Sequence, residues 1–316
     1  MLGNIKKFIK QYPFFWRLQQ RRYDRICEQH SRMSYAEIEA HIGRRYEAMF
    51  GRKLNWDNPQ TYNEKIHVSK LYMPSPLKTR LADKYLVREW IREKIGGEYL
   101  IPLLGVYDSF DEIDFDSLPD RFVIKCNHDS GSYALVKDKS KLNKKLLKLK
   151  FDAFMGRNYA WMNWEMHYKD IKPRIIIEEY IETATNNYEF LCFEGKPYFC
   201  WIDFDHLTDR RRNVYNMNWE IMPFNISHCT NYPEYVPCPT EFEVLNDFAV
   251  RLSQGFNMVR VDFYLADGKI YFEEMTFSSG NGFSIMSPDE WDYKLGSLWT
   301  FDNTGRRKIL SERTRP

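Results

Sequence analysis

Two acidic residues on a predicted hairpin in the C-terminal part of the chain have the types and spacing of a magnesium site. Residues 258–265 and 270–275 read as strands, and the short turn between them makes them antiparallel neighbours. Asp262 and Glu274 should therefore face each other. Two carboxylates at such a short distance repel each other unless a cation lies between them. A set of oxygen ligands without His or Cys favours Mg²⁺. The alternative is a hairpin whose acids are solvated on an outer face.

A loop rich in Gly and Ser, residues 277–282, follows the second strand of this hairpin. Glycines let backbone N–H groups approach phosphate oxygens closely. Mg²⁺ held by one or two carboxylates usually bridges such oxygens. The hairpin and its loop together predict a site for a nucleotide phosphate.

A lysine at the end of a short apolar strand forms a second candidate contact. Residues 122–126 are predicted to form this strand. The ammonium group of Lys125 is costly to bury there unless an anion lies beside it. The polar turn that follows contains Ser130, Gly131 and Ser132. This turn could fold over phosphates as a flexible lid.

A third candidate lies at the end of a β-branched strand, residues 174–180. The edge of such a strand, beside apolar Ile181, has free backbone groups that can bind the edge of an adenine. The carboxylates of Glu178 and Glu179 can reach the adenine amino group or the ribose. Each of the three signals is weak alone, and their order along the chain strengthens them.

The remaining elements that must position these residues are mostly helical in the first 80 residues and mixed thereafter. Pro74 and Pro76 break the early helices, and a Lys-rich helix near residues 140–157 most simply has a solvated face. A further hairpin is expected at residues 188–202 and an amphipathic helix at residues 241–255. The pattern indicates an α+β protein.

Composition excludes several classes of protein. The chain has 316 residues with 43% apolar and 28% charged side chains, and its 46 Lys and Arg against 44 Asp and Glu give a net charge of only +2. That balance offers no global field for nucleic acid. The six cysteines show no C-x-x-C pair, which argues against a zinc knuckle or a disulfide framework. No apolar run of roughly 18 residues exists to span a membrane, so a cytoplasmic protein is expected.

The order of these motifs resembles the ATP-grasp superfamily and, within it, the TupA-like ATP-grasp group linked to bacterial surface-polysaccharide clusters. The closer likeness is carried by residues 61–65 (TYNEK), 81–85 (LADKY), 99–108 (YLIPLLGVYD), 122–132 (FVIKCNHDSGS) and 274–283 (EMTFSSGNGF). The resemblance implies the ATP-grasp fold, in which two α+β lobes sandwich ATP. The expected division is a helical region at 1–80, lobe A at 81–177, lobe B at 178–300 and a charged, frayed tail at 301–316.

The resemblance also implies roles for individual residues. Two lysines would contact the ATP phosphates, an acidic residue and the nearby backbone would hold adenine, and the hairpin acids would bind Mg²⁺. The lysines are Lys84 and Lys125. The adenine contacts are Glu178 and the backbone near Ile181, and the metal ligands are Asp262 and Glu274. Arg260 and Lys125 are the expected catalytic residues. Arg260 would neutralise charge on the transferred phosphoryl group or on the bound carboxylate.

Two positions depart from the family pattern. Thr276 stands where most superfamily members have an Asn metal ligand, which puts the binding of a second Mg²⁺ in question. Glu189 stands on a hairpin strand where a basic residue is expected.

The implied activity is that of an ADP-forming carboxylate–amine ligase. A carboxylate would attack the γ-phosphate of ATP to give an acylphosphate, and an amine would then displace phosphate to form an amide. A different class, a sugar-nucleotide glycosyltransferase, is suggested by the D-x-D pattern Asp203-Phe204-Asp205. A Mg-ATP kinase acting on a sugar or protein hydroxyl is a third reading.

The expected substrates are the carboxylate of a uronic acid from a capsular or other surface-polysaccharide precursor and a small amine. A basic loop with Arg210, Arg211 and Arg212 is a candidate for an anionic sugar, although a solvated loop fits equally, and Asn281 is a further candidate contact. The basic segment 1–10 either packs on the protein or lies on anionic lipid at the inner face of the membrane.

Overall fold

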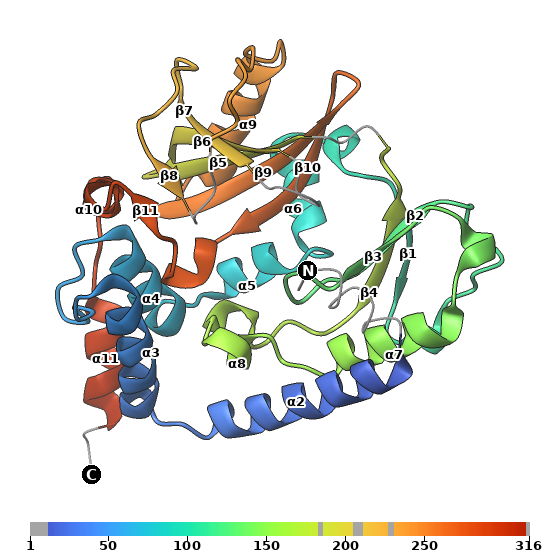
Figure 1. Ribbon diagram of the computed structural model, residues 1–316, viewed down its shortest axis with the longest axis horizontal. Helices are drawn as coiled ribbons and strands as arrows, with labels where there is room; N and C mark the ends of the chain where they lie inside the picture. Colours follow the sequence, from blue (N-terminus) through green and yellow to red (C-terminus); the bar gives the residue numbers. More distant parts are fainter. Residues whose placement is uncertain (1–11, 183–185, 205–210, 227–230, 314–316) are drawn as a thin grey trace.

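The computed structural model describes residues 12–182, 186–204, 211–226 and 231–313 (Figure 1). Two antiparallel sheets stand at an angle to each other, with helices α5 (Pro76–Ala82) and α6 (Val87–Lys94) between them and a helical layer along one side. Across the described ranges no helix is both long and apolar enough to cross a membrane.

The first sheet has the strand order β1-β4-β2-β3, with each neighbouring pair antiparallel. One of its two inner strands, β4, contains Ile175, Ile176 and Ile177, which are fully buried, as a continuous β-branched run predicts. Helix α7 (Lys144–Met155) covers one face with Leu147, Phe151 and other apolar side chains. The four strands are β1 (Leu103–Tyr107), β2 (Phe122–Cys126), β3 (Tyr133–Val136) and β4 (Ile175–Glu179).

The second sheet has the order β10-β9-β5-β6-β7 and is antiparallel throughout. Both predicted hairpins are confirmed within it. Glu178, the first residue of the predicted lobe B, lies on β4 in the first sheet. Its strands are β5 (Asn186–Phe193), β6 (Lys196–Phe204), β7 (Arg211–Asn216), β9 (Met258–Ala266) and β10 (Lys269–Thr276).

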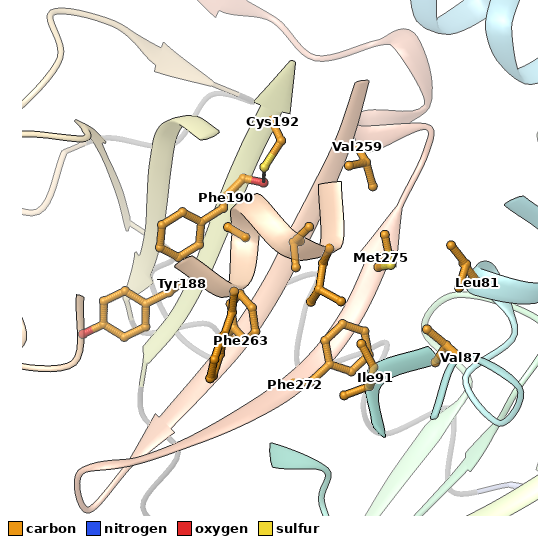
Figure 2. Packing of buried hydrophobic residues seen from close by; sticks show 14 of the residues in the cluster. Leu81, Val87, Ile91, Tyr188, Phe190, Cys192, Val259, Phe263, Phe272 and Met275 are labelled. Carbon is orange, nitrogen blue, oxygen red and sulfur yellow. Dashed lines mark hydrogen bonds between the residues drawn. The ribbon is translucent and has the colours of Figure 1, made fainter. Parts of the chain in front are cut away.

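The two faces of this sheet have different roles. Alternate residues such as Phe190 and Phe263 point to the face that packs against α9 (Phe242–Ser253). Figure 2 shows the same core continuing to Ile91 of α6, which lies beside Phe272 of β10. The opposite face carries the charged residues of the hairpin.

Helix α4 (Tyr62–Tyr72) is the most enclosed helix of the described chain, because all eleven of its residues are buried. Thr61 and Glu64 form a capping box at its start, and Lys65 donates to the carbonyls of Gly296 and Trp299. The 61–65 motif therefore secures this helix in the fold.

The charged tail is not frayed as expected. Residues Thr304–Arg313 form α11, and Arg306 donates to Glu39 at 2.7 Å and to Asp57 at 2.5 Å. These ion pairs link the tail to the N-terminal helices. The other helices and short strands are α2 (Pro13–Ser31), α3 (Tyr35–Phe50), α5 (Pro76–Ala82), α6 (Val87–Lys94), α8 (Ala160–Asn163), α10 (Glu290–Ser297), η1 (Gly97–Tyr99), η2 (Phe110–Glu112), η3 (Lys139–Lys141), η4 (Met166–Tyr168), η5 (Ser279–Gly282), β8 (Asn225–Ile226) and β11 (Met286–Ser287).

Candidate active site

The two acids of the β9–β10 hairpin face each other, as the turn between the strands predicts. Glu274 is the register partner of Asp262. Arg260, two residues earlier on β9 and so on the same face, lies between them. Its Nε is 2.8 Å from Asp262 Oδ1, and its Nη2 is 2.5 Å from Asp262 Oδ2 and 3.3 Å from Glu274 Oε1. The cation between the two carboxylates in this structure is therefore the Arg260 guanidinium.

Asp262 is buried, whereas Arg260 and Glu274 are partly exposed, and the opposite charges of the three lie close together. Burial works to lower the pKa of Arg260, but Asp262 and Glu189 outweigh it and raise that pKa well above its usual value. Burial raises the pKa of Asp262. Burial also works to raise the pKa of Glu274, but Lys84 and Arg260 more than offset this and keep it below its ordinary value. Glu274 is thus held ionised.

The oxygen atoms around Arg260 have the chemistry of a magnesium site. Asp262, Glu274 and the Thr276 hydroxyl, which donates to Glu274 at 3.0 Å, are hard oxygen ligands. Within the described ranges no three His, Cys, Asp or Glu side chains are grouped as metal ligands. Mg²⁺ bound with a nucleotide needs only one or two protein carboxylates. The donor set present therefore fits that ion.

The two predicted phosphate lysines both meet carboxylates. Lys84 Nζ donates to the Asp129 carbonyl at 2.5 Å and lies 3.8 Å from Glu274 Oε2, so it links the two lobes. Lys125 Nζ lies 2.6 Å from Glu178 Oε2. The anion that the strand-end lysine needs is supplied here by Glu178.

The predicted phosphate loop has an exposed tip and a buried base. Ser130 and Gly131 are exposed, and Gly131 has a left-handed φ of 81° with open space around its Cα. Ser132 is different, because it is buried and its hydroxyl donates to Asp129 at 2.5 Å. Arg157 donates to the same Asp129 carboxylate at 2.6 Å. The Ser132 side chain thus belongs to the buried base, whereas Ser130 and Gly131 form the exposed part of the predicted lid.

The strand end predicted to hold adenine passes from one lobe to the other. Glu178 is buried and Glu179 is exposed. Ile181 packs with Ile101 and Tyr271, so it contacts the second lobe. Arg88 Nη1 donates to Glu178 at 3.0 Å, which gives that carboxylate a second cationic partner.

The predicted basic loop is not a loop where the structure describes it. Arg211 and Arg212 lie on strand β7, and Arg210 lies outside the described residues. Arg212 is buried, and its Nε and Nη2 donate to Asp203 at 2.5 and 2.7 Å. The carboxylate that begins the D-x-D pattern is thus occupied by an arginine, and Asp205 is also outside the described part.

Asn281 lies in η5, directly after the β9–β10 hairpin. Its backbone carbonyl accepts a hydrogen bond from Lys70 at 2.9 Å, and its side-chain oxygen accepts another. Lys70 is buried in α4, and burial lowers its pKa to about 7. Helix α4 therefore holds loop η5 in place through Lys70.

Several residues of this site were not foreseen. Arg88 and Arg157 fix Glu178 and Asp129, yet each lies in a helix or turn with no motif around it. Glu273, at a bulge beside Glu274, accepts from Tyr264 at 2.5 Å and from Asn187 at 2.9 Å. The double acid Glu273-Glu274 was the only signal in the sequence for that contact.

A family model described as TupA-like ATP-grasp matches residues 64–300, about three quarters of the chain. No curated protein matches the sequence.

Among solved structures, the chain is similar to the D-alanine–D-alanine ligase of Bacillus anthracis complexed with ATP, at 18% identity over 63% of this chain and 54% of that one, with a TM-score of 0.37. It is also similar to the ATP-grasp ligase PsnB complexed with a precursor variant, Mg and ADP, at 11% identity over 65% and 52%, with a TM-score of 0.40. It is likewise similar to the D-alanine–D-alanine ligase of Helicobacter pylori, at 14% identity over 69% of this chain and 58% of that one, with a TM-score of 0.39. The chain spans about half the length of these structures.

Proposed function

The chain belongs to the TupA-like ATP-grasp family, and on that premise we propose that it is an ATP-dependent carboxylate–amine ligase that releases ADP. The observation that carries the proposal is the meeting of Lys84 from the first lobe with Glu274 from the second, at 3.8 Å. Cations from one lobe and carboxylates from the other are what binding of a metal–triphosphate between them requires.

The residues present fit both parts of Mg-ATP. Lys84 and Lys125 would bind phosphate oxygens, with the exposed loop tip at Ser130 and Gly131 beside them. The adenine would lie against Glu178 and the backbone near Ile181. Mg²⁺, when bound by Asp262 and Glu274 with Thr276 beside them, would neutralise phosphate charge and orient the transferred group.

The chemistry proposed for the site is positioning and charge neutralisation. A substrate carboxylate attacks the γ-phosphorus, ADP leaves, and an amine then displaces phosphate from the acylphosphate. Arg260 is the group best placed to neutralise the charge that develops, because it lies directly between the two hairpin acids.

We place the substrates among surface-polysaccharide precursors, with a uronic acid as the acid and a small amino compound as the amine. Arg211 and Asn281 remain the described candidates for contact with this anionic sugar. ADP release from ATP across a panel of uronic acids and amines tests the proposal directly. Release of UDP from a sugar nucleotide would instead indicate a glycosyltransferase, and ADP release driven by a hydroxyl acceptor alone would indicate a kinase.

Such precursors are assembled at the cytoplasmic face of the membrane, and we propose a peripheral position there. Phe14 and Leu18 at the start of α2 are exposed, directly after the lysines of segment 1–10. Each lysine near an anionic surface contributes about 1 kcal/mol. Co-sedimentation with anionic vesicles of the full chain and of a chain starting at Phe14 tests this. Equal, poor binding of both would refute the membrane contact and leave the ligase proposal intact.

A further inference from the structure

Glu189 is an acid shared by two arginines at the centre of the second sheet. It lies on β5 as the register partner of Asp262 and is only 4% exposed. Its Oε2 is 3.2 Å from Arg260 Nη1, and both of its carboxylate oxygens are 3.3 Å from Arg212 Nη2. The carboxylate therefore connects Arg260 of β9 to Arg212 of the edge strand β7, across the same face of the sheet.

The second partner of Glu189, Arg212, is held in place independently of the β9–β10 hairpin. Arg212 makes a two-pronged contact with Asp203, and its guanidinium lies 4.9 Å from the centre of the Trp201 ring. Burial works to lower the pKa of Arg212, but Glu189 and Asp203 outweigh it and raise that pKa. Glu189 is thus tied to a fixed cation and keeps its position when its other partner moves.

Arg260 divides its donors between two sets of acceptors. Nε and Nη2 are directed at Asp262 and Glu274, whereas Nη1 is directed at Glu189 and donates to Ser279 at 3.1 Å. The first set consists of the carboxylates that would hold a metal ion. A guanidinium and a divalent cation repel each other and compete for the same oxygens. Arg260 must therefore release the first set for a metal ion to bind both acids.

We propose that Glu189 is a positioning residue that retains Arg260 in the site when Asp262 and Glu274 become metal ligands. This inference rests on the proposed function. Arg260 exchanges two acceptors for one without leaving the cluster, because Nη1 already faces Glu189. It also gives a reason for an acid at this strand position, where a basic residue was expected: the site carries an internal anion for its own arginine.

Mn²⁺ is a direct probe of this exchange, because free Mn²⁺ is measured by electron paramagnetic resonance without any turnover. Binding is measured for the wild type, Glu189→Gln, Arg260→Met and the double variant, with and without a non-hydrolysable ATP analogue. We expect Glu189→Gln to weaken Mn²⁺ binding about tenfold, since Arg260 then has no anion to move to. Arg260→Met alone should strengthen Mn²⁺ binding without nucleotide, because the competing cation is gone. In the Arg260→Met background, Glu189→Gln should change the affinity by less than about twofold.

Loss of any nearby negative charge also weakens cation binding, so a matched control is needed. Glu165 is a buried carboxylate that interacts electrostatically with Glu274 and accepts a hydrogen bond from the Ser278 hydroxyl. Glu165→Gln therefore removes the same charge without altering a contact of Arg260. Equal weakening by Glu165→Gln and Glu189→Gln, or an unchanged effect of Glu189→Gln in the Arg260→Met background, would overturn the positioning role.

Two further measurements keep the outcomes distinct. Thermal unfolding of each variant checks folding, and Arg260→Lys, which keeps the charge but lacks the guanidinium fork, replaces Arg260→Met if the latter is unfolded. In that background the effect of Glu189→Gln should again be smaller than in the wild type. A wild type that binds no Mn²⁺ even with the nucleotide analogue overturns the proposed function and this inference together. Mn²⁺ binding without coupling between the two residues overturns this inference alone.

Discussion

Replacing Glu178 by Gln should destabilise the protein, because this buried carboxylate neutralises two cations at once. Its oxygens lie 2.6 Å from Lys125 Nζ and 3.0 Å from Arg88 Nη1. The side chains of Glu178 and Arg88 are only 6% and 7% exposed. Glutamine has nearly the same shape, so the change removes the charge and leaves two cations facing a neutral amide.

The size of the effect follows from the burial of each partner. Removing one member of a buried ion pair costs about 3–5 kcal/mol. Lys125 is 19% exposed, so water recovers part of its charge, and the amide oxygen still accepts one hydrogen bond. We therefore expect Glu178→Gln to lower the free energy of unfolding by about 3 kcal/mol, at the lower end of that range.

Urea unfolding, followed by fluorescence and circular dichroism together, measures this loss. Glu179→Gln is the matched control, because the same change one residue later affects an exposed side chain and should stay within about 0.5 kcal/mol of the wild type. Adding Lys125→Met to Glu178→Gln should cost clearly less than the two separate losses combined, because one of the unpaired cations is then absent. A Glu178→Gln protein as stable as the Glu179→Gln control would refute the argument, and Glu178 would then be free to act on the nucleotide alone.

Three further outcomes test the site and the fold. Asp262→Asn and Glu274→Gln should each leave the protein folded, as a cooperative thermal unfolding transition shows, and abolish ADP release, and normal rates in both would remove the metal site from the proposal. Oxygen-18 in the substrate acid should appear in the released phosphate, whereas label retained wholly in the product rejects the acylphosphate. Burial, reinforced by Lys78 and Lys70, lowers the pKa of His167 to about 3 from 6.5, so the unfolded chain binds this proton first as the pH falls. Stability should therefore fall by up to about 1.4 kcal/mol per pH unit between pH 6.5 and 3, and urea unfolding of His167→Asn should give a shallower slope over that range; an identical slope would contradict the assignment.

The parts of the site that lie on hairpins could be predicted from the sequence. A short turn fixes the register of its two strands, so Asp262 and Glu274 had to come opposite each other. The same alternation puts Arg260 on their face. What the local pattern does not contain is the direction of the Arg260 side chain, which fills the position predicted for a metal ion.

Pairings between distant segments could not be predicted. Arg88 meets Glu178 ninety residues later, and Arg157 meets Asp129 across a helix and a strand. Neither pair has a periodic signal, since each depends on how whole elements pack. The helix of the tail could not be predicted for the same reason, because the contact of Arg306 with Glu39 joins segments far apart in the sequence.

The helix start at residues 61–65 fixes α4 in the fold and, through it, supports loop η5. Its residues make structural contacts, with Asn63 donating to Asp292 and to the Ser284 carbonyl, and so they fix α4 against the C-terminal helices. Helix α4 in turn supports loop η5: Lys70 binds Asn281, and a side chain on Gly282, whose φ is 77°, would come within 2.7 Å of the His67 ring. Helix α4 is thus part of the floor of the proposed site. Because α4 is fully buried, it cannot itself contact a substrate, and under the proposed function we expect discrimination between substrate acids to come from the exposed side of η5.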